Sequence, residues 1–327
     1  MKAISCIIFF LCFLVGSAQE IKISTTESKV SFRGLSVYKN TVWVGGSQGT
    51  VGRSLDNGAT WQWLKVPGFE KQDFRDIEAF DDQTAIIMAI ASPAYILKTQ
   101  NGGKTWAKVY ENQHPDIFLD AMAFKSSREG IVIGDPIKGR FFVAETIDGG
   151  ASWRESNRLA LPPAHAGEAF FAASGSNIVW GGANYWIASG GLASRVFFNS
   201  KAVALPTLRG QQMTGANGMA VRGRRILIAA GDYTNLTRSD SSFVYSADGG
   251  KTWKIPNEMP SGYRSGVCFI SKQKAITCGM TGVDITADGG RTWKKISNQS
   301  FNACAYNEQG KTVHFAGNNG RVGKLQL

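Results

Sequence analysis

Short apolar segments separated by polar turns recur along the chain. Each unit starts with an apolar segment such as 74–80 (FRDIEAF), 118–124 (FLDAMAF) or 263–269 (YRSGVCF). A polar turn follows, and then a run that ends in glycine, such as 41–46 (TVWVGG) or 130–134 (GIVIG). Two further segments complete the unit. Runs of this length and composition, bounded by turn residues, predict units of four β-strands.

One eight-residue phrase marks the turn between the third and fourth strands of a unit. Its consensus is Ser/Thr-x-Asp-x-Gly-x-Thr-Trp, and its near-copies occupy residues 54–61, 99–106, 146–153, 246–253 and 286–293. Successive tryptophans of the phrase lie 45, 47, 100 and 40 residues apart. A period of about 40 to 50 residues is typical of propeller blades. The double-length gap predicts one decayed copy, which we place near residues 195–200.

The number of leading strands predicts the number of blades. Seven leads are found, and they begin near residues 32, 74, 118, 167, 213, 263 and 301. The last unit is one strand short, and an unassigned strand at 21–25 (IKIST) precedes the first lead. We therefore predict an all-β, seven-bladed β-propeller, a single domain over residues 19–327, with its ring closed by pairing of the N- and C-terminal strands. Six or eight blades are the alternative counts.

The aspartate of the repeated phrase is interpreted as structural. Its carboxylate can accept backbone N–H bonds inside its own turn, where glycine supplies the positive φ. The five positions are Asp56, Asn101, Asp148, Asp248 and Asp288. Because equivalent carboxylates spaced around a ring cannot converge on one substrate, a catalytic role is not expected for them.

The first residues predict export. Lys2 is followed by an apolar run over 4–15 and by small residues at 16–18, which is typical of a secretory signal peptide spanning 1–18. The apolar run is short for a membrane span, which needs roughly 20 residues. We expect a secreted or periplasmic protein that does not insert into a membrane.

The charge of the chain indicates which classes of partner are expected. The formal net charge is +11, which favours anionic partners, but the charges are dispersed along the chain and argue against nucleic acid.

Beyond the signal peptide the cysteines are Cys268, Cys278 and Cys304, an odd number that predicts no disulfide framework. Cys268 and Cys278 could face each other across a hairpin, and buried free thiols are the alternative.

Nothing in the sequence predicts a cofactor. The three histidines lie in different units without metal-ligand spacing, and no nucleotide-binding glycine motif is present. We expect no metal, no cofactor and a monomer.

The leads place charged residues around the predicted channel mouth. Aligned position by position, they bring to one height Arg33, Arg75, Leu119, Gly167, Arg264 and Asn302. Acids follow one step deeper, at Asp76, Asp120 and Glu168, and the loops and the irregular fourth blade add Asp135, Asp232, Tyr233 and Arg195. These groups either pair with one another along a water-filled channel or bind an anion through the planar guanidinium forks.

The repeated phrase is the Asp box, or BNR repeat, of sialidases and other propellers. The series of leads and joins, SFRGLSV, DFRDIEAF, DAMAF, GEAFFAASG, SGGLASRVF, GYRSGV and FNACAY, resembles exported bacterial relatives of the photosystem II stability/assembly factor family. The resemblance covers essentially the whole mature chain. It implies a seven-bladed propeller of the WD40/YVTN/BNR-like class and a non-catalytic scaffold that binds a protein through basic residues on its central face.

A glycoside hydrolase is the alternative function. Sialidases use an arginine triad, a Tyr–Glu pair and an aspartate, which Arg33, Arg75 and Arg264 could mimic together with acids of the mouth. The catalytic candidates are Glu168, Asp120 and Asp76, with Tyr263 or Tyr233 as the tyrosine. The Phe/Tyr-Arg-Ile-Pro phrase of sialidases is absent, and no motif supports an oxidoreductase. Ordinary glycoside hydrolysis requires two carboxylates about 5 to 10 Å apart.

Overall fold

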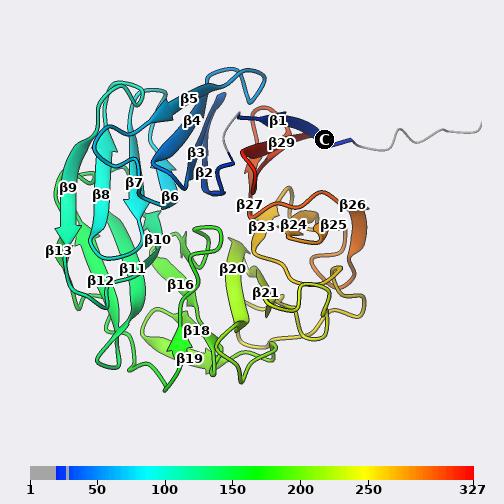
Figure 1. Ribbon diagram of the computed structural model, residues 1–327. Coiled ribbons are helices and arrows are strands. Elements are labelled where there is room, and N and C mark those ends of the chain that lie inside the picture. Colours follow the sequence, from blue (N-terminus) through cyan, green and yellow to red (C-terminus); the bar gives the residue numbers. More distant parts are fainter. Residues whose placement is uncertain (1–19, 27–28) are drawn as a thin grey trace, which may run out of the picture.

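The structure is a computed structural model that describes residues 20–26 and 29–327. Its strands form seven sheets arranged radially around one axis, as Figure 1 shows. This arrangement confirms the predicted seven-bladed β-propeller. The predicted signal peptide, residues 1–18, lies outside the described residues. Over the part of the chain that is described, no helix is long and apolar enough to cross a membrane.

Consecutive strands build each of the first three blades. Blade 1 contains β2 (Phe32–Tyr38), β3 (Thr41–Gly46), β4 (Thr50–Ser54) and β5 (Gln62–Lys65). Blade 2 contains β6 (Phe74–Ala79), β7 (Ala85–Ala89), β8 (Ala94–Thr99) and β9 (Ala107–Asn112). Blade 3 contains β10 (Leu119–Phe124), β11 (Gly130–Ile137), β12 (Arg140–Thr146) and β13 (Arg154–Glu155). All neighbouring strands in them are antiparallel.

Blades 4 and 5 are less regular. Blade 4 contains β15 (Ile178–Gly181), β16 (Asn184–Ala188), β18 (Arg195–Phe198) and β19 (Lys201–Ala204). Blade 5 contains β20 (Thr214–Arg222), β21 (Arg225–Asp232) and β22 (Phe243–Ser246), and its sheet is extended by the short strands β14 (Glu168–Ala169) and β17 (Gly190–Gly191). Blade 4 is the unit with the decayed phrase, and its last two strands span the place where we expected it.

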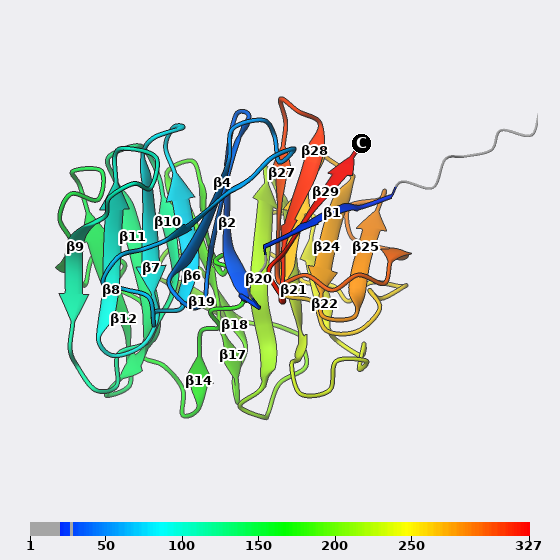
Figure 2. The same ribbon diagram turned by 45° about the horizontal axis from the view of Figure 1, so that its top comes forward.

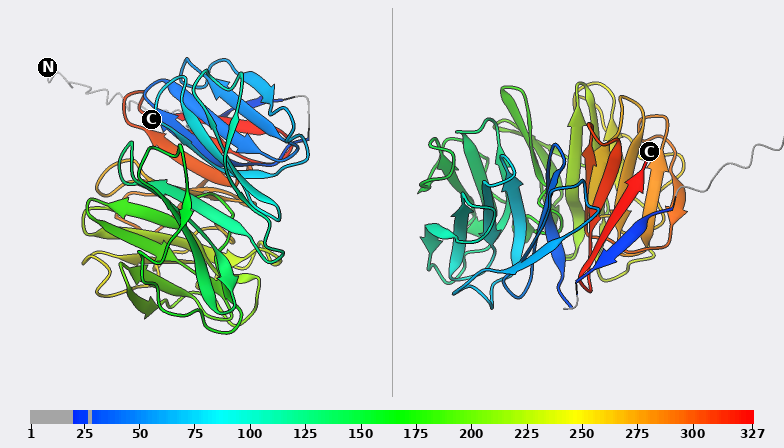
Figure 3. Two further views of the ribbon diagram at one scale, coloured as in Figure 1. Left: turned by 90° about the vertical axis from the view of Figure 1, so that its left-hand side faces the viewer. Right: turned by 90° about the horizontal axis from the view of Figure 1, so that it is seen from above.

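The last two blades include the closure of the ring. Blade 6 contains β23 (Gly266–Phe269), β24 (Ala275–Gly279), β25 (Gly282–Thr286) and β26 (Lys294–Ser297). Blade 7 contains β27 (Ala303–Asn307), β28 (Thr312–Ala316), β29 (Arg321–Gln326) and, as its outer strand, β1 (Lys22–Thr25). Strand β1 pairs antiparallel with β29, and Figures 2 and 3 show the two strands side by side. The predicted closure by the two ends of the chain is confirmed.

The first strand of each blade lies next to the axis. Strands β2, β6, β10, β15, β20, β23 and β27 contact one another in this order and close back on β2. Apolar side chains of adjacent blades form the cores between them, as where Trp43 of blade 1 meets Phe74 and Ile87 of blade 2. A side chain at Gly34 would meet the backbone of Asp76 at 2.9 Å, because neighbouring inner strands run so close together.

The lead assigned to the fourth blade is corrected by the structure. The inner strand of blade 4 is β15, which begins at Ile178, whereas the lead near residue 167 lies outside that blade. Residues 164–173, which we call the crossing segment, instead line the central cavity described below. The apolar residues of this lead suggested an inner strand. One of them, Phe170, is buried in the core between blades 3 and 4.

The Asp-box turns have the expected internal hydrogen bonds. In the third copy, Asp148 Oδ1 accepts the amide protons of Ala151 and Ser152 at 3.0 Å, and Oδ2 accepts the hydroxyl of Ser152 at 2.6 Å. Thr146 donates its hydroxyl to Asp148 and accepts the amide of Gly150. The carboxylate is therefore occupied by its own turn.

The cysteines beyond the predicted signal peptide carry free thiols. Cys268 pairs in register with Ile276, and Cys278 pairs with Gly266. The two cysteines are thus diagonal neighbours in the hairpin rather than directly opposite, and the alternative of free thiols holds.

Candidate functional site

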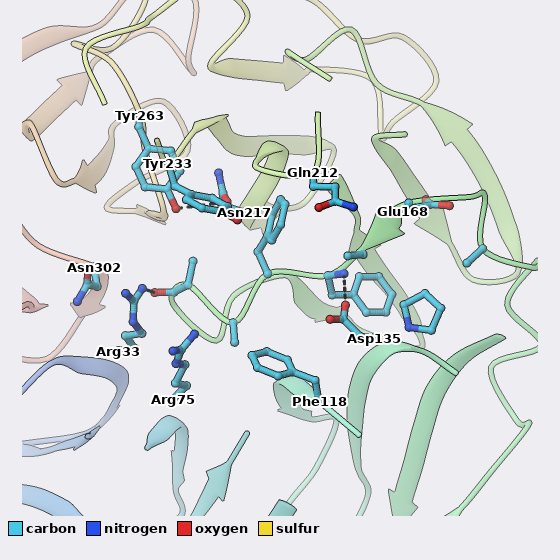
Figure 4. A pocket seen from close by; sticks show the side chains of 18 of the residues that line it. Arg33, Arg75, Phe118, Asp135, Glu168, Gln212, Asn217, Tyr233, Tyr263 and Asn302 are labelled. Carbon is cyan, nitrogen blue, oxygen red and sulfur yellow. Dashed lines mark hydrogen bonds between the residues drawn. The ribbon is translucent and has the colours of Figure 1, made fainter. Parts of the chain in front are cut away.

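A central cavity of about 1070 Å³ opens where the inner strands and their preceding loops meet. Its walls come from blades 1, 2, 3, 5, 6 and 7 and from the crossing segment. Figure 4 shows the side chains that line it. Among the predicted site residues, those that line the cavity are Arg33, Arg75, Asp135, Gly167, Glu168, Tyr233, Tyr263 and Asn302.

Irregularities in the inner strands aim side chains at the cavity. The strand pairing shifts by one residue at Arg33, Arg75, Asp120 and Asn217, in four different blades. A β-bulge places two residues opposite one and turns a side chain away from the regular alternation. The shared bulge explains why Arg33, Arg75 and Asn217 all reach the cavity wall.

Arg33 and Arg75 form an incompletely neutralised pair of cations. Arg75 Nε donates to Asp73 at 2.8 Å, whereas among the described residues Arg33 donates only to the carbonyl oxygen of Ala173, at 3.4 Å. Burial, and then the charge of Arg75, lower the pKa of the Arg33 guanidinium from its ordinary value. Figure 4 shows the two guanidinium groups next to each other. Because two guanidinium groups have only the Asp73 carboxylate as a paired anion, the site favours the binding of a further anion.

Aromatic rings form much of the remaining wall. The Arg75 guanidinium lies 5.9 Å from the centre of the Phe118 ring, and Phe171 meets Tyr233 edge to face at 5.9 Å. Tyr263 donates its hydroxyl to Asn217 at 3.3 Å. The cavity therefore combines a cationic side with apolar and aromatic surface, a combination that suits a ligand with both an anionic and an apolar group.

Asp135 anchors the crossing segment to blade 3. Its Oδ1 accepts the amide proton of Phe170 at 2.9 Å. Burial raises the pKa of Asp135 to about 6, although this hydrogen bond opposes the shift. The carboxylate belongs to the wall, and part of its role is to position the segment.

Two of the three deeper acids, Asp76 and Asp120, are buried and do not line the cavity. Asp76 accepts the amide protons of Met122, at 2.6 Å, and of Ile77, at 2.8 Å, so it joins the inner strands of blades 2 and 3. Asp120 is fully buried, and its carboxylate forms no well-aligned hydrogen bond within the described structure. Burial, and then the nearby charge of Asp135, raise the pKa of Asp120 well above its usual range.

Glu168 is committed to an internal ion pair. Its carboxylate accepts from Arg195 Nη2 at 2.6 Å and Nε at 2.8 Å, and also from the hydroxyl of Ser189. Both side chains are buried, and Arg195 does not line the cavity. The pair fixes β14 of the crossing segment to blade 4, and Figure 4 shows the Glu168 side chain apart from the arginines.

The expected position of Arg264 is corrected by the structure. Its side chain is fully buried and donates to Asp284 Oδ2 in its own blade, and it does not line the cavity. The amide of Arg264 bonds to the end of the second strand of the preceding blade, as the amides of Phe32 and Phe301 do. Arg264 therefore occupies the buried aromatic position of the lead, one residue before the position of Arg33. The alignment of the leads was one residue out of register in this blade.

The same displacement affects blade 3. Leu119, which the alignment placed level with Arg33, takes the buried position of Phe32. Asp120, expected one step deeper, takes the bulge position of Arg33. Gly167 lies on the crossing segment rather than on an inner strand.

Two further predicted residues hold the walls in place. Asn302 donates to the carbonyl of Phe32 and to Asn318, both at 2.9 Å, and so joins blade 7 to blade 1. Asp232 caps its own loop by accepting from Thr234, which leaves the neighbouring Tyr233 to face the cavity.

The path of the crossing segment was not predicted from the sequence, and neither were Phe118, Phe171 and Asn217 as wall residues. A partial signal existed for Asn217, because its lead carries glycines on both sides of it, as a bulge beside a closely packed strand would require.

Comparisons with known proteins agree with this fold. A BNR/Asp-box repeat model matches residues 244–254, which include the fourth copy of the phrase. Comparison with curated proteins gives no match. Solved structures that are similar include YCF48 bound to D1 peptide, with 14% identity and a TM-score of 0.66 over 94% of this chain and 97% of that one.

Two other solved structures are instructive. YCF48 from Cyanidioschyzon merolae is 12% identical with a TM-score of 0.60, covering 94% of this chain and 98% of that one. The GH74 enzyme of Niastella koreensis is 13% identical with a TM-score of 0.60, covering 91% of this chain and 52% of that one. The chain is thus a β-propeller with Asp-box repeats that is similar in fold to the solved YCF48 structures.

Proposed function

We propose that this protein is a non-catalytic scaffold that binds an anionic segment of a partner protein in the central cavity, and that it does so after export. The observation that carries the proposal is the pair Arg33 and Arg75, which face the cavity, while a single carboxylate, Asp73, is paired with Arg75. A carboxylate of the partner would complete the neutralisation through bidentate hydrogen bonds.

The form of the cavity supports a peptide as ligand. A volume of about 1070 Å³ exceeds what a single small anion needs, and the aromatic rings of Phe118, Phe171 and Tyr233 offer surface for apolar side chains. The similar propeller YCF48 is known bound to D1 peptide, which supports peptide binding by a fold of this kind.

A glycoside hydrolase is the second candidate, because a GH74 enzyme shares the fold. The state of the predicted catalytic acids argues against it. Glu168 is neutralised by Arg195, while Asp76 and Asp120 are buried below the cavity and do not reach its surface. The free acid of the wall would have to be Asp135 or Asp116.

Peptide-array capture tests the proposal. We expect the purified protein to retain peptides that combine acidic and aromatic residues, and Arg33→Gln with Arg75→Gln to lose them. Arg222→Gln is the matched control, since Arg222 is an exposed arginine of blade 5 outside the cavity. Retention of the same peptides by the double variant would contradict the proposed site, and turnover of chromogenic glycosides that depends on Asp135 would favour the hydrolase.

A further inference from the structure

A second cavity lies at the seam where blade 7 meets blade 1. It has a volume of about 480 Å³, within the range of about 300 to 1,000 Å³ typical of small-molecule sites. Its lining includes Glu20, Lys22, Trp61, His314, Lys324 and Gln326. The walls are thus the two strands that close the ring, the second strand of blade 7 and the Asp-box turn of blade 1. Figure 3 shows β1 and β29 at this seam.

His314 stands where other seams have an apolar side chain. At the second glycine position of each Asp box, the space above the turn is filled by the second strand of the preceding blade. The side chains found there are Trp43 against Gly103, Ile86 against Gly150, Trp186 against Gly250 and Leu227 against Gly290. At Gly58 the corresponding neighbour is His314, whose Nδ1 lies 3.1 Å from the position of an added Cβ.

The Asp-box turn that faces His314 also differs in sequence from the other four. Asn57 occupies a position that is glycine in the other four boxes, and it keeps the positive φ of 57°. Its Oδ1 accepts from Asn307 Nδ2 at 2.7 Å and from Thr312 at 3.1 Å, and it lies 2.8 Å from His314 Nε2. With two donors already directed at this oxygen, His314 Nε2 acts as a third donor and carries the ring proton.

His314 Nδ1 is consequently an acceptor without a partner. The residue is 1% exposed, and Nδ1 has no hydrogen-bond partner among the described residues. Burial, and then the charge of Lys324, lower the pKa of His314 to about 4, so the ring is neutral at pH 7. A buried acceptor that lines a cavity is satisfied when a ligand supplies a hydroxyl or N–H donor.

The cavity also carries unpaired cations. Lys22 and Lys324 are directly opposite each other in the β1–β29 pair, a placement of like charges that weakens strand pairing. Neither forms an ion pair with a carboxylate of the described chain, including Glu20 at the same rim. Trp61, stacked on Trp63 at 5.2 Å, adds an aromatic surface to the lining.

We propose that this seam cavity binds a small hydroxylated carboxylate of the sugar-acid type. The carboxylate is received by Lys22 and Lys324, a hydroxyl donates to His314 Nδ1, and the sugar ring lies against Trp61. This site is separate from the central cavity and does not depend on the function proposed for it.

Calorimetric titration of the full-length protein with sodium D-glucuronate at pH 7 tests the site. We expect binding that D-glucose and acetate fail to reproduce, because the first lacks the charge and the second lacks the hydroxyls. His314→Leu should weaken binding about tenfold or more, the usual effect of losing one buried hydrogen bond. The fold should tolerate this change, since Leu227 fills the equivalent position at another seam.

Lys22→Gln provides a second variant at an exposed side chain, with an expected loss of about threefold that shrinks as salt is added. Lys294→Gln, an exposed lysine of blade 6, is the matched control and should bind as the wild type does. Arg33→Gln should also leave glucuronate binding unchanged. Absence of glucuronate binding, equal binding by His314→Leu, or equal binding of acetate would each overturn the proposal.

Discussion

Arg264→Ala distinguishes a buried structural arginine from the arginines of the cavity. Arg264 Nε donates to Asp284 Oδ2 at 2.7 Å, and Nη2 donates to the same oxygen. Nη1 donates to the carbonyl of Tyr263 and to the hydroxyl of Thr281, both at 2.7 Å. The alanine variant removes all of these contacts and leaves Asp284, which is 1% exposed, without its cation.

The expected loss is large. Removing one partner of a buried ion pair costs about 3–5 kcal/mol, because the remaining charge is left in a medium that solvates it poorly. For a domain of this size, about 2 °C of melting temperature corresponds to 1 kcal/mol, so the midpoint should fall by about 6–10 °C. Arg33→Ala should change stability by less than about 1 kcal/mol, because Arg33 has one weak hydrogen bond and is repelled by Arg75.

Thermal and urea unfolding followed by tryptophan fluorescence measure both variants. Arg264→Met combined with Asp284→Leu should recover most of the lost stability, since an apolar pair of similar volume replaces a buried ion pair at little cost. An unfolding midpoint of Arg264→Ala within 2 °C of the wild type would refute the assignment of Arg264 to the blade interior.

Three further predictions concern titration and local order. Burial raises the pKa of Asp56, but hydrogen bonds from Thr60 outweigh this effect and lower the pKa to about 2. The ionised carboxylate therefore stabilises the fold above about pH 4, and this stabilisation is lost as the pH falls toward 2. In Asp56→Asn, the unfolding midpoint should fall less between pH 7 and pH 2.5 than it does in the wild type. An equal fall in both proteins would contradict the lowered pKa of Asp56. Burial raises the pKa of Glu78 from 4.5 to about 7, so folded stability decreases as the pH rises through that interval. Glu78→Gln should therefore be stabilised relative to the wild type at pH 8 and not at pH 4, and equal effects at both values would contradict the shift. Asp135→Ala should speed hydrogen exchange at the Phe170 amide, with the Asp148 turn of blade 3 as an internal reference, and unchanged exchange would mean that the crossing segment is held by other contacts.

The blade count and the ring closure were predictable because they rest on local signals. The Asp-box turn can be recognised from the sequence because its hydrogen bonds lie within five residues, as between Asp148 and Ser152. The spacing of the tryptophans in successive copies follows from the length of a blade. The unpaired segment at 21–25 and the incomplete last unit together predicted the β1–β29 pair.

The positions of the site residues were less predictable because they depend on register. A bulge inserts one residue, and a one-residue slip in the alignment moves a side chain from the cavity into the blade. Arg264 was misplaced in this way, and Leu119 and Asp120 were also one residue out of register, whereas Arg33 and Arg75 line the cavity. The path of the crossing segment depends on contacts over long separations, such as Phe170 with Asp135, which no local pattern encodes.

The pairing of β1 with β29 has a consequence for the order of folding. Lys22 and Lys324 meet across that pair, so β1, the first strand of the described chain, cannot pair until β29, the last one, has been made. Until then, blades 1 to 6 can form only an open arc with two exposed edges, and joining such distant segments is slow because of the entropy of loop closure. A chain interrupted before β29 would remain such an arc and would keep unpaired strand edges that the closed ring does not expose.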